Sequence, residues 1–74
     1  AAPLLRRWKL ARAAVAGYER TLMAATLDGT KTRAAIAACA DWLTYCLSIG
    51  WDRSQLKTLQ EIWWAHHDDQ GRIV

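Results

Sequence analysis

The stretch KTRAAIAACADWLTYCLSIG, residues 31–50, decides the fold of this chain. Its apolar side chains recur at helical spacing and cover about half of a helical wheel, roughly twice the arc of an ordinary surface helix. A face that wide can contact two other helices at once, so the sequence predicts a central helix over residues 31–49. Thr30 or Thr32 can cap its start, and Gly50 ends it. The apolar set is Ala35, Ile36, Cys39, Trp42, Leu43, Cys46, Leu47 and Ile49.

A heptad-like apolar stripe precedes this segment. It begins after Pro3, a residue that suits a first helical turn, and its members alternate at spacings of four and three residues. The stripe predicts a helix over residues 3–27, which Asp28 and Gly29 end. Its members are Leu4, Trp8, Ala11, Val15, Tyr18, Leu22 and Ala25.

Four basic residues of the first segment are expected on the side opposite the apolar stripe. We call them the basic stripe: Arg6, Lys9, Arg12 and Arg20. A row of cations like this one can contact nucleic acid, an anionic membrane surface or an acidic protein. It can equally be a solvated outer face, so the pattern alone assigns it no role.

A third helical segment follows Gly50. Asp52 can cap it, with Gln55 in the capping-box position, and the pattern predicts a helix over residues 53–67. Its inner face is expected to hold Leu56, Leu59, Ile62, Trp63 and His66. Three helices with short connections predict an all-α fold, a small three-helix bundle that forms one domain over residues 1–74.

The predicted helices differ in length. A first helix of about 25 residues would be ~37 Å long, whereas a third helix of about 15 residues would reach only ~22 Å. Part of the first stripe then lacks a partner inside the chain. A chain of 74 residues is also only marginally stable alone. The sequence therefore predicts a homodimer.

Composition places the chain among globular proteins, with 53% apolar and 23% charged residues and a single proline. No stretch approaches the ~18 uncharged apolar residues of a membrane span. Cys39 and Cys46 would lie ~10 Å apart along one helix, too far for a disulfide with each other. Two unpaired thiols are typical of a reducing compartment, so we expect a cytoplasmic protein.

The sequence indicates no catalytic or metal centre. It contains no Gly-rich phosphate loop, and its seven acidic residues are scattered. His66 and His67 are adjacent, so on a helix they point ~100° apart and cannot share an ion without help. Zinc sites usually show closely spaced ligand pairs, and none occurs here. We therefore expect no enzyme activity, no cofactor, no metal and no small-molecule substrate.

The turn between the second and third segments resembles the helix-turn-helix pattern over residues 42–61. That motif needs a small inward residue on its first helix, a glycine in the turn and two apolar anchors on the second helix. Cys46, Gly50, Leu56 and Leu59 stand at suitable spacings. The side chains that would then face a DNA major groove are Arg53, Ser54, Gln55, Lys57 and Thr58.

Three features depart from that pattern. Tyr45 replaces the usual small residue next to Cys46, and the first helix would be far longer than the motif uses. Residues 52–74 also carry three basic and four acidic side chains, a net charge of −1, whereas residues 1–27 carry five basic and one acidic, a net charge of +4. Cations that contact phosphates supply most DNA affinity. DNA binding is therefore the alternative prediction.

Tryptophan is the unusual residue, with five copies and no phenylalanine. Trp64 projects ~100° away from Trp63 and has no partner face inside the bundle on a helical wheel. An exposed Trp beside Arg and Lys is typical of an interface centre. The leading prediction is a non-enzymatic protein-binding module, an adaptor or inhibitor of the kind that phages and mobile elements often carry. Its predicted contact residues are Trp64, Lys57, Arg53, Gln60 and Tyr45.

Overall fold

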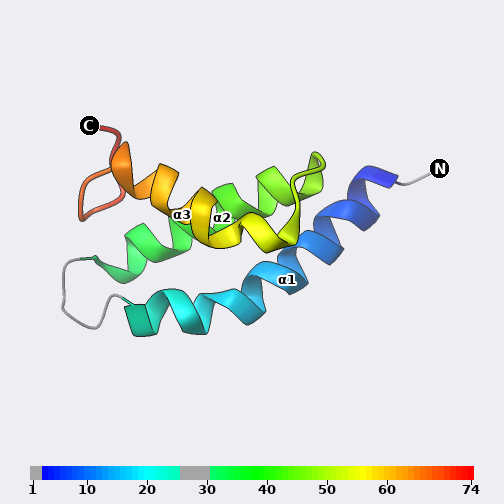
Figure 1. Cartoon of the computed structure of the whole chain (residues 1–74), viewed down its shortest axis with the longest axis horizontal. Helices are drawn as coiled ribbons and strands as arrows, with labels where there is room; N and C mark the ends of the chain where they lie inside the picture. Colours follow the sequence, from blue (N-terminus) through cyan, green and yellow to red (C-terminus); the bar gives the residue numbers. More distant parts are fainter. Residues whose placement is uncertain (1–2, 26–30) are drawn as a thin grey trace.

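The computed structural model describes residues 3–25 and 31–74, and these residues form a three-helix bundle. The helices are α1 (Pro3–Ala25), α2 (Arg33–Ser48) and α3 (Leu56–Ala65), and a short 3₁₀ turn, η1 (Arg53–Gln55), leads into α3. Successive helices run in opposite directions, and α1 lies along one side of α2 (Figure 1). The predicted all-α, three-helix architecture is confirmed.

The helix boundaries follow from local capping. Thr32 caps α2, its Oγ1 accepting a hydrogen bond from the Ala35 N–H at 3.1 Å. Gly50, at φ +115°, lies in the turn that follows α2. The Asp52 carboxylate accepts from the Ser54 N–H at 3.1 Å, so the third segment begins as a 3₁₀ turn and not as an α-helix at residue 53. The predicted first-helix end at Asp28 and Gly29, and the alternative cap Thr30, lie outside the described residues.

The core confirms that α2 is the central helix. Half of the buried cluster comes from α2, and α1 and α3 supply the rest from the two sides of α2. Two buried hydroxyls on α2 are satisfied within the helix, since Thr44 donates to the Ala40 carbonyl and Ser48 to the Tyr45 carbonyl. The cluster consists of Val15, Leu22, Ile36, Cys39, Ala40, Leu43, Cys46, Leu56, Leu59 and Trp63.

The tail that follows α3, residues 66–74, folds back on the bundle. His67 and Ile73 form an antiparallel β-bridge, and the Thr32 N–H donates to the Asp69 carbonyl at 3.1 Å. The second bond ties the tail to the start of α2. The helical pattern therefore ends at Ala65, two residues earlier than the sequence predicts.

At the opposite end of the bundle, α1 extends past the α2–α3 turn (Figure 1, blue turns). Helix α1 has 23 residues and α2 only 16, so the apolar stripe of α1 continues where nothing covers it. Leu4 is 73% exposed and Trp8 is 40% exposed, whereas Val15 and Leu22 on the same stripe are fully buried. The sequence predicts that part of this stripe lacks a partner inside the chain, and these first turns are that part, because α2 ends before it reaches them. We call this end of the bundle, with the exposed side chains of Leu4 and Trp8, the open end.

Candidate functional site

Trp64, the predicted interface anchor, has partners inside the chain. It is half-buried and packs against the core cluster. Its ring meets Trp63 edge to face, with ring centroids 4.7 Å apart and an interplanar angle of 84°. The ammonium nitrogen of Lys31 lies 4.6 Å from the centroid of the Trp64 ring. The prediction that Trp64 has no partner face is therefore wrong, because the residues just before α2 reach over this side of α3.

The other predicted contact residues divide into two groups. Gln60 is half-buried, and its Oε1 accepts a hydrogen bond from the Tyr18 hydroxyl at 3.0 Å, which joins α3 to α1. Arg53, Lys57 and Tyr45 are exposed, but Tyr45 stands on α2, away from the hollow that Arg53 and Lys57 share. Of the five predicted contact residues, the structure brings together Arg53 and Lys57.

The residues of the helix-turn-helix pattern adopt the expected burial. Cys46, Leu56 and Leu59 are buried, and Gly50 takes a positive φ in the turn. The five polar side chains predicted to face DNA are all exposed: Arg53, Ser54, Gln55, Lys57 and Thr58.

Helix α1, however, lies beside the start of α3. Arg53, Ser54 and Lys57 line a hollow of about 290 Å³ whose other wall is formed by α1. A DNA duplex approaching these three side chains would meet α1, and the first of the motif's predicted contacts stand on η1 instead of an α-helix. The α1 wall consists of Ala14, Gly17, Tyr18 and Thr21.

All four residues of the basic stripe are exposed, as expected. Arg12 also contacts α2 at the surface, with its Nη1 3.2 Å from the Asp41 carboxylate and 3.6 Å from that of Glu19. Its long side chain reaches an acid on the neighbouring helix, so Arg12 already has ion-pair partners inside the chain.

The two histidines differ in burial. His66, predicted on the inner face, is exposed. His67 is half-buried and stacks on Trp63, with ring centroids 3.7 Å apart and planes within 4° of parallel, while its Nδ1 lies 2.8 Å from the Trp63 carbonyl oxygen. The helical wheel misplaces His66 because α3 ends at Ala65 and the next residues are not helical. Ile62, also predicted inward, is nearly half exposed. Across residues 3–25 and 31–74, no cluster of His, Cys, Asp or Glu suits a metal ion.

The two cysteines are buried and unpaired. Burial in the core raises the pKa of Cys39 to about 12, with a smaller contribution from the nearby Cys46, and burial also raises the pKa of Cys46. A thiol with a raised pKa is a poor nucleophile at neutral pH. Both residues act as small apolar core groups, as the sequence predicts.

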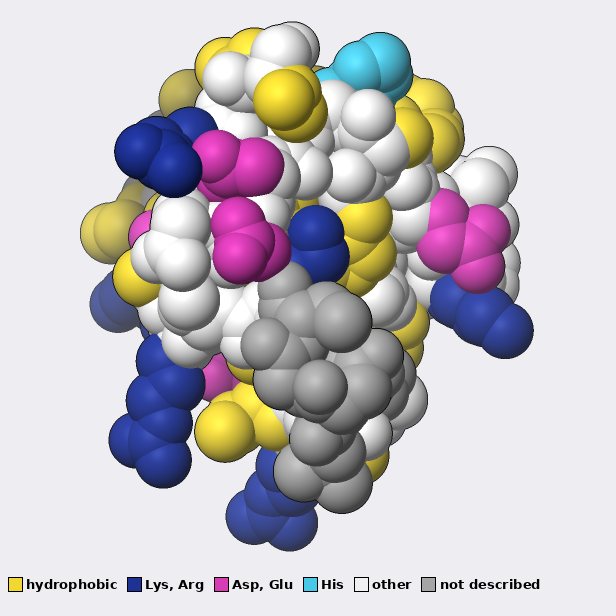
Figure 2. Space-filling model, turned by 90° about the vertical axis from the view of Figure 1, so that its left-hand side faces the viewer, with side chains coloured by type: hydrophobic (Ala, Val, Ile, Leu, Met, Phe, Trp, Pro, Cys, Tyr) yellow, Lys and Arg dark blue, Asp and Glu magenta, His cyan; other side chains and the backbone are white. Residues whose placement is uncertain are grey.

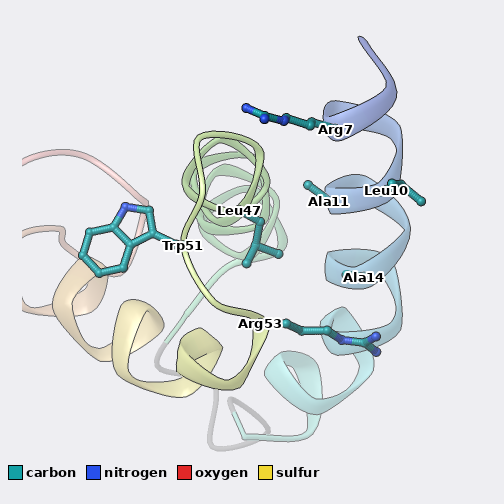
Figure 3. Close-up of a pocket in the computed structure, with 7 residues that line it drawn as sticks. All are labelled: Arg7, Leu10, Ala11, Ala14, Leu47, Trp51 and Arg53. Carbon is teal, nitrogen blue, oxygen red and sulfur yellow. The ribbon is translucent and has the colours of Figure 1, made fainter. Parts of the chain in front are cut away.

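The open end holds a hollow that sequence reasoning did not identify. It has a volume of about 270 Å³ and lies between the N-terminal half of α1 and the α2–α3 turn (Figure 3). Two arginines and five apolar residues line it, and no acidic residue does. Trp51, which stands in the turn beside it, is 48% exposed. The lining residues are Arg7, Leu10, Ala11, Ala14, Leu47, Trp51 and Arg53.

Two further hollows of similar size have more polar walls. The one beside α3 includes the hydroxyls of Tyr18, Thr21 and Ser54. The other contains the ion pair between Arg12 and Glu19. The hollow at the open end therefore differs from them in combining apolar walls with cations alone.

The surface at the far end of the bundle has a different character. Figure 2 views the molecule from the end that carries the tail, where side chains of both charges lie interspersed. The apolar side chains described on that face appear as separate small areas. Asp68 at this end is satisfied locally, since its carboxylate accepts from the Gln70 and Arg72 backbone N–H groups and pairs with the Arg72 guanidinium at 3.0 Å.

One sequence signal marks this part of α1 as unusual. Leu10 falls outside the heptad-like stripe, and it follows Arg7 on the same helix by three residues. A large apolar residue beside a basic one on the outer side of an otherwise amphipathic helix marks a second apolar face. The signal does not locate the hollow, because Leu10 extends from α1 away from the turn (Figure 3).

In the described part of the chain, no helix combines the length and the apolar character needed to cross a membrane. Comparison of the chain with protein-family models, with curated proteins and with solved structures found no match.

Proposed function

We propose that this protein is a binding module, an adaptor or inhibitor, that presents the open end of its bundle to a partner protein. The observation that carries the proposal is the uncovered part of the α1 stripe, where Leu4 and Trp8 remain exposed. Apolar side chains of this size, set among basic residues, are the usual composition of an interface.

Two features support binding rather than catalysis as the proposed role. The hollow of about 270 Å³ lies below the ~300–1,000 Å³ typical of sites for drug-sized molecules. The thiol whose pKa is raised to about 12, that of Cys39, is buried in the core and does not line that hollow. We therefore propose no cofactor and no small-molecule substrate.

Affinity capture from the native host tests the proposed function with matched variants. The wild-type chain is compared with Leu4→Ser/Trp8→Ser, which changes the open end, and with Tyr45→Ser/Ile62→Ser, which changes two equally large exposed side chains elsewhere. We expect one protein to be retained by the wild type and by the second variant and to be lost from the first. Equal retention by all three chains contradicts the proposal.

DNA binding through residues 42–61 is the second candidate, and the burial of Cys46, Leu56 and Leu59 around the Gly50 turn favours it. A gel shift at several salt concentrations tests it. DNA binding predicts that Gln55→Ala weakens binding several-fold for one DNA sequence only. Binding that disappears on Arg6→Ala/Arg12→Ala for every sequence indicates a general charge effect instead.

The homodimer also stays a prediction. The uncovered turns of α1, with Leu4 and Trp8, supply an apolar strip that two copies can share. Sedimentation equilibrium at increasing concentration measures the mass directly. A mass that stays monomeric at high concentration contradicts the dimer. A cytoplasmic location and carriage by a mobile element likewise remain predictions.

A further inference from the structure

The hollow at the open end indicates the chemistry of the partner. We infer that it receives one bulky apolar side chain from an acidic segment of the partner protein. Carboxylates on either side of that anchor then pair with Arg7 and Arg53. The inference rests on the proposed function and adds to it the nature of the bound segment.

The shape of the hollow suits a single anchoring side chain. Its floor includes Ala11 and Ala14, whose small side chains leave space between α1 and the facing turn. Leu10, which is 64% exposed, and Trp51 bound the hollow on its two sides, and both side chains extend away from it in Figure 3. Buried aromatic or aliphatic anchors in pockets of this kind carry most of the energy of a protein interface.

The charges at the hollow select an acidic partner. Figure 3 shows Arg7 extending from α1 toward the turn and Arg53 extending from η1 toward α1, at opposite ends of the hollow. Neither guanidinium forms an ion pair within residues 3–25 and 31–74, unlike those of Arg12 and Arg72. Arginine binds carboxylates through two parallel hydrogen bonds, so each end offers a site for one acidic side chain.

A second copy of this chain does not supply that segment. Three of the described acidic residues already contact an arginine of their own chain: Glu19, Asp41 and Asp68. The others belong to different elements of the chain and do not flank one apolar side chain together: Asp52, Glu61 and Asp69. A nucleic acid fits less well than a protein, because a phosphate backbone requires a row of cations and the floor here is apolar.

Selection of peptides from a random library tests the inference. The library is selected on the immobilised full chain and counter-selected on Leu47→Ala, which alters the hollow but keeps its charge. We expect peptides in which Asp or Glu stands on both sides of one large apolar residue. Their binding should shift the NMR signals of the Arg7 and Arg53 guanidinium N–H groups in the wild-type chain.

Charge reversal tests the role of the two arginines. Affinity for a selected peptide should fall about tenfold or more on Arg7→Glu/Arg53→Glu, since a favourable charge pair at each end becomes repulsive. The matched control Arg20→Glu/Arg33→Glu changes the net charge equally at other exposed positions and should reduce affinity much less. Circular dichroism confirms that both variants fold.

The possible results separate the two proposals. Three results would overturn the acidic segment while leaving protein binding intact. They are neutral or basic peptides bound in the hollow, equal losses of affinity in the two double variants, and a dimer formed through the hollow. If the open end retains no peptide and no host protein, the proposed function fails, and this inference fails with it.

Discussion

Gly71 lies where the tail crosses α2, and its backbone conformation requires glycine. Its φ is +80°, and a Cβ at this position would stand 3.0 Å from the Cα of Ala35. Gly17, by contrast, lies within α1, where a Cβ would meet nothing within 4 Å. The two glycines therefore have opposite consequences for stability.

We expect Gly71→Ala to lower the free energy of unfolding by about 1–3 kcal/mol, because both the positive φ and the close approach become strained. Gly17→Ala should raise it by roughly 0.5–1 kcal/mol, since alanine favours the helix. Urea denaturation followed by circular dichroism measures both. Effects of the same sign in the two variants would show that the tail does not pack as described.

Cys39 makes stability depend on pH in the alkaline range. Burial holds its pKa at about 12 in the folded chain, against an ordinary value of 9.0 in the unfolded chain. Between these values the unfolded state binds fewer protons than the folded state, so the free energy of unfolding falls as pH rises above about 9. The slope from this one thiol is at most about 1.4 kcal/mol per pH unit.

Denaturation midpoints measured from neutral pH to pH 10 check this dependence. The variant Cys39→Ala should be less stable at neutral pH but should lose stability less steeply as pH rises. Parallel curves for the two chains would mean that the thiol is not protected by burial.

At the scale of the elements, capping and pairing set where each helix begins and how it meets its neighbour. Thr32 acts on both counts, because its Oγ1 caps α2 and its backbone N–H holds the tail. The ion pair of Arg12 with Asp41 joins α1 to α2 at the surface, where such pairs contribute only about 0–1 kcal/mol. The Thr32 cap is therefore expected to contribute more to the free energy of unfolding than the ion pair between Arg12 and Asp41.

Thr32→Ala should lower the free energy of unfolding by about 1 kcal/mol, through loss of the cap hydrogen bond. Thr58→Ala is the matched control, since Thr58 is exposed inside α3 and alanine is the better helix former there. Thermal unfolding monitored by circular dichroism compares them. If Thr32→Ala leaves the stability unchanged while Thr58→Ala lowers it, the described start of α2 is contradicted.

At the scale of the whole molecule, the bundle has a closed core at its centre and an open end. Leu43 is fully buried between the helices, whereas Leu10 is mostly exposed beside the hollow. The same residue type thus serves stability in one place and, in our proposal, binding in the other.

Leu43→Ala should destabilise the fold by about 2–5 kcal/mol, enough to unfold a substantial fraction of so small a chain. Leu10→Ala should change stability by less than about 0.5 kcal/mol. Circular dichroism in urea measures the difference. A large loss on Leu10→Ala would mean that the open end is part of the core and not a free surface.

Much of the fold follows from the sequence alone. Apolar periodicity predicts three helices and the central position of α2, and the caps Thr32 and Asp52 follow from local hydrogen bonding that needs no distant partner. The burial of Cys39 and Cys46 follows from the same periodicity. These features depend on residues close together in the chain, so a single sequence determines them.

The candidate site was decided by tertiary structure. A helical wheel gives the direction of a side chain around its axis, but not whether a neighbour is present at that height along the axis. Trp8 points toward the core side and is exposed because α2 ends too soon, while Trp64 points away and is half-buried beside Lys31. The hollow between Arg7 and Arg53 likewise exists only because residues far apart in the sequence meet at the open end.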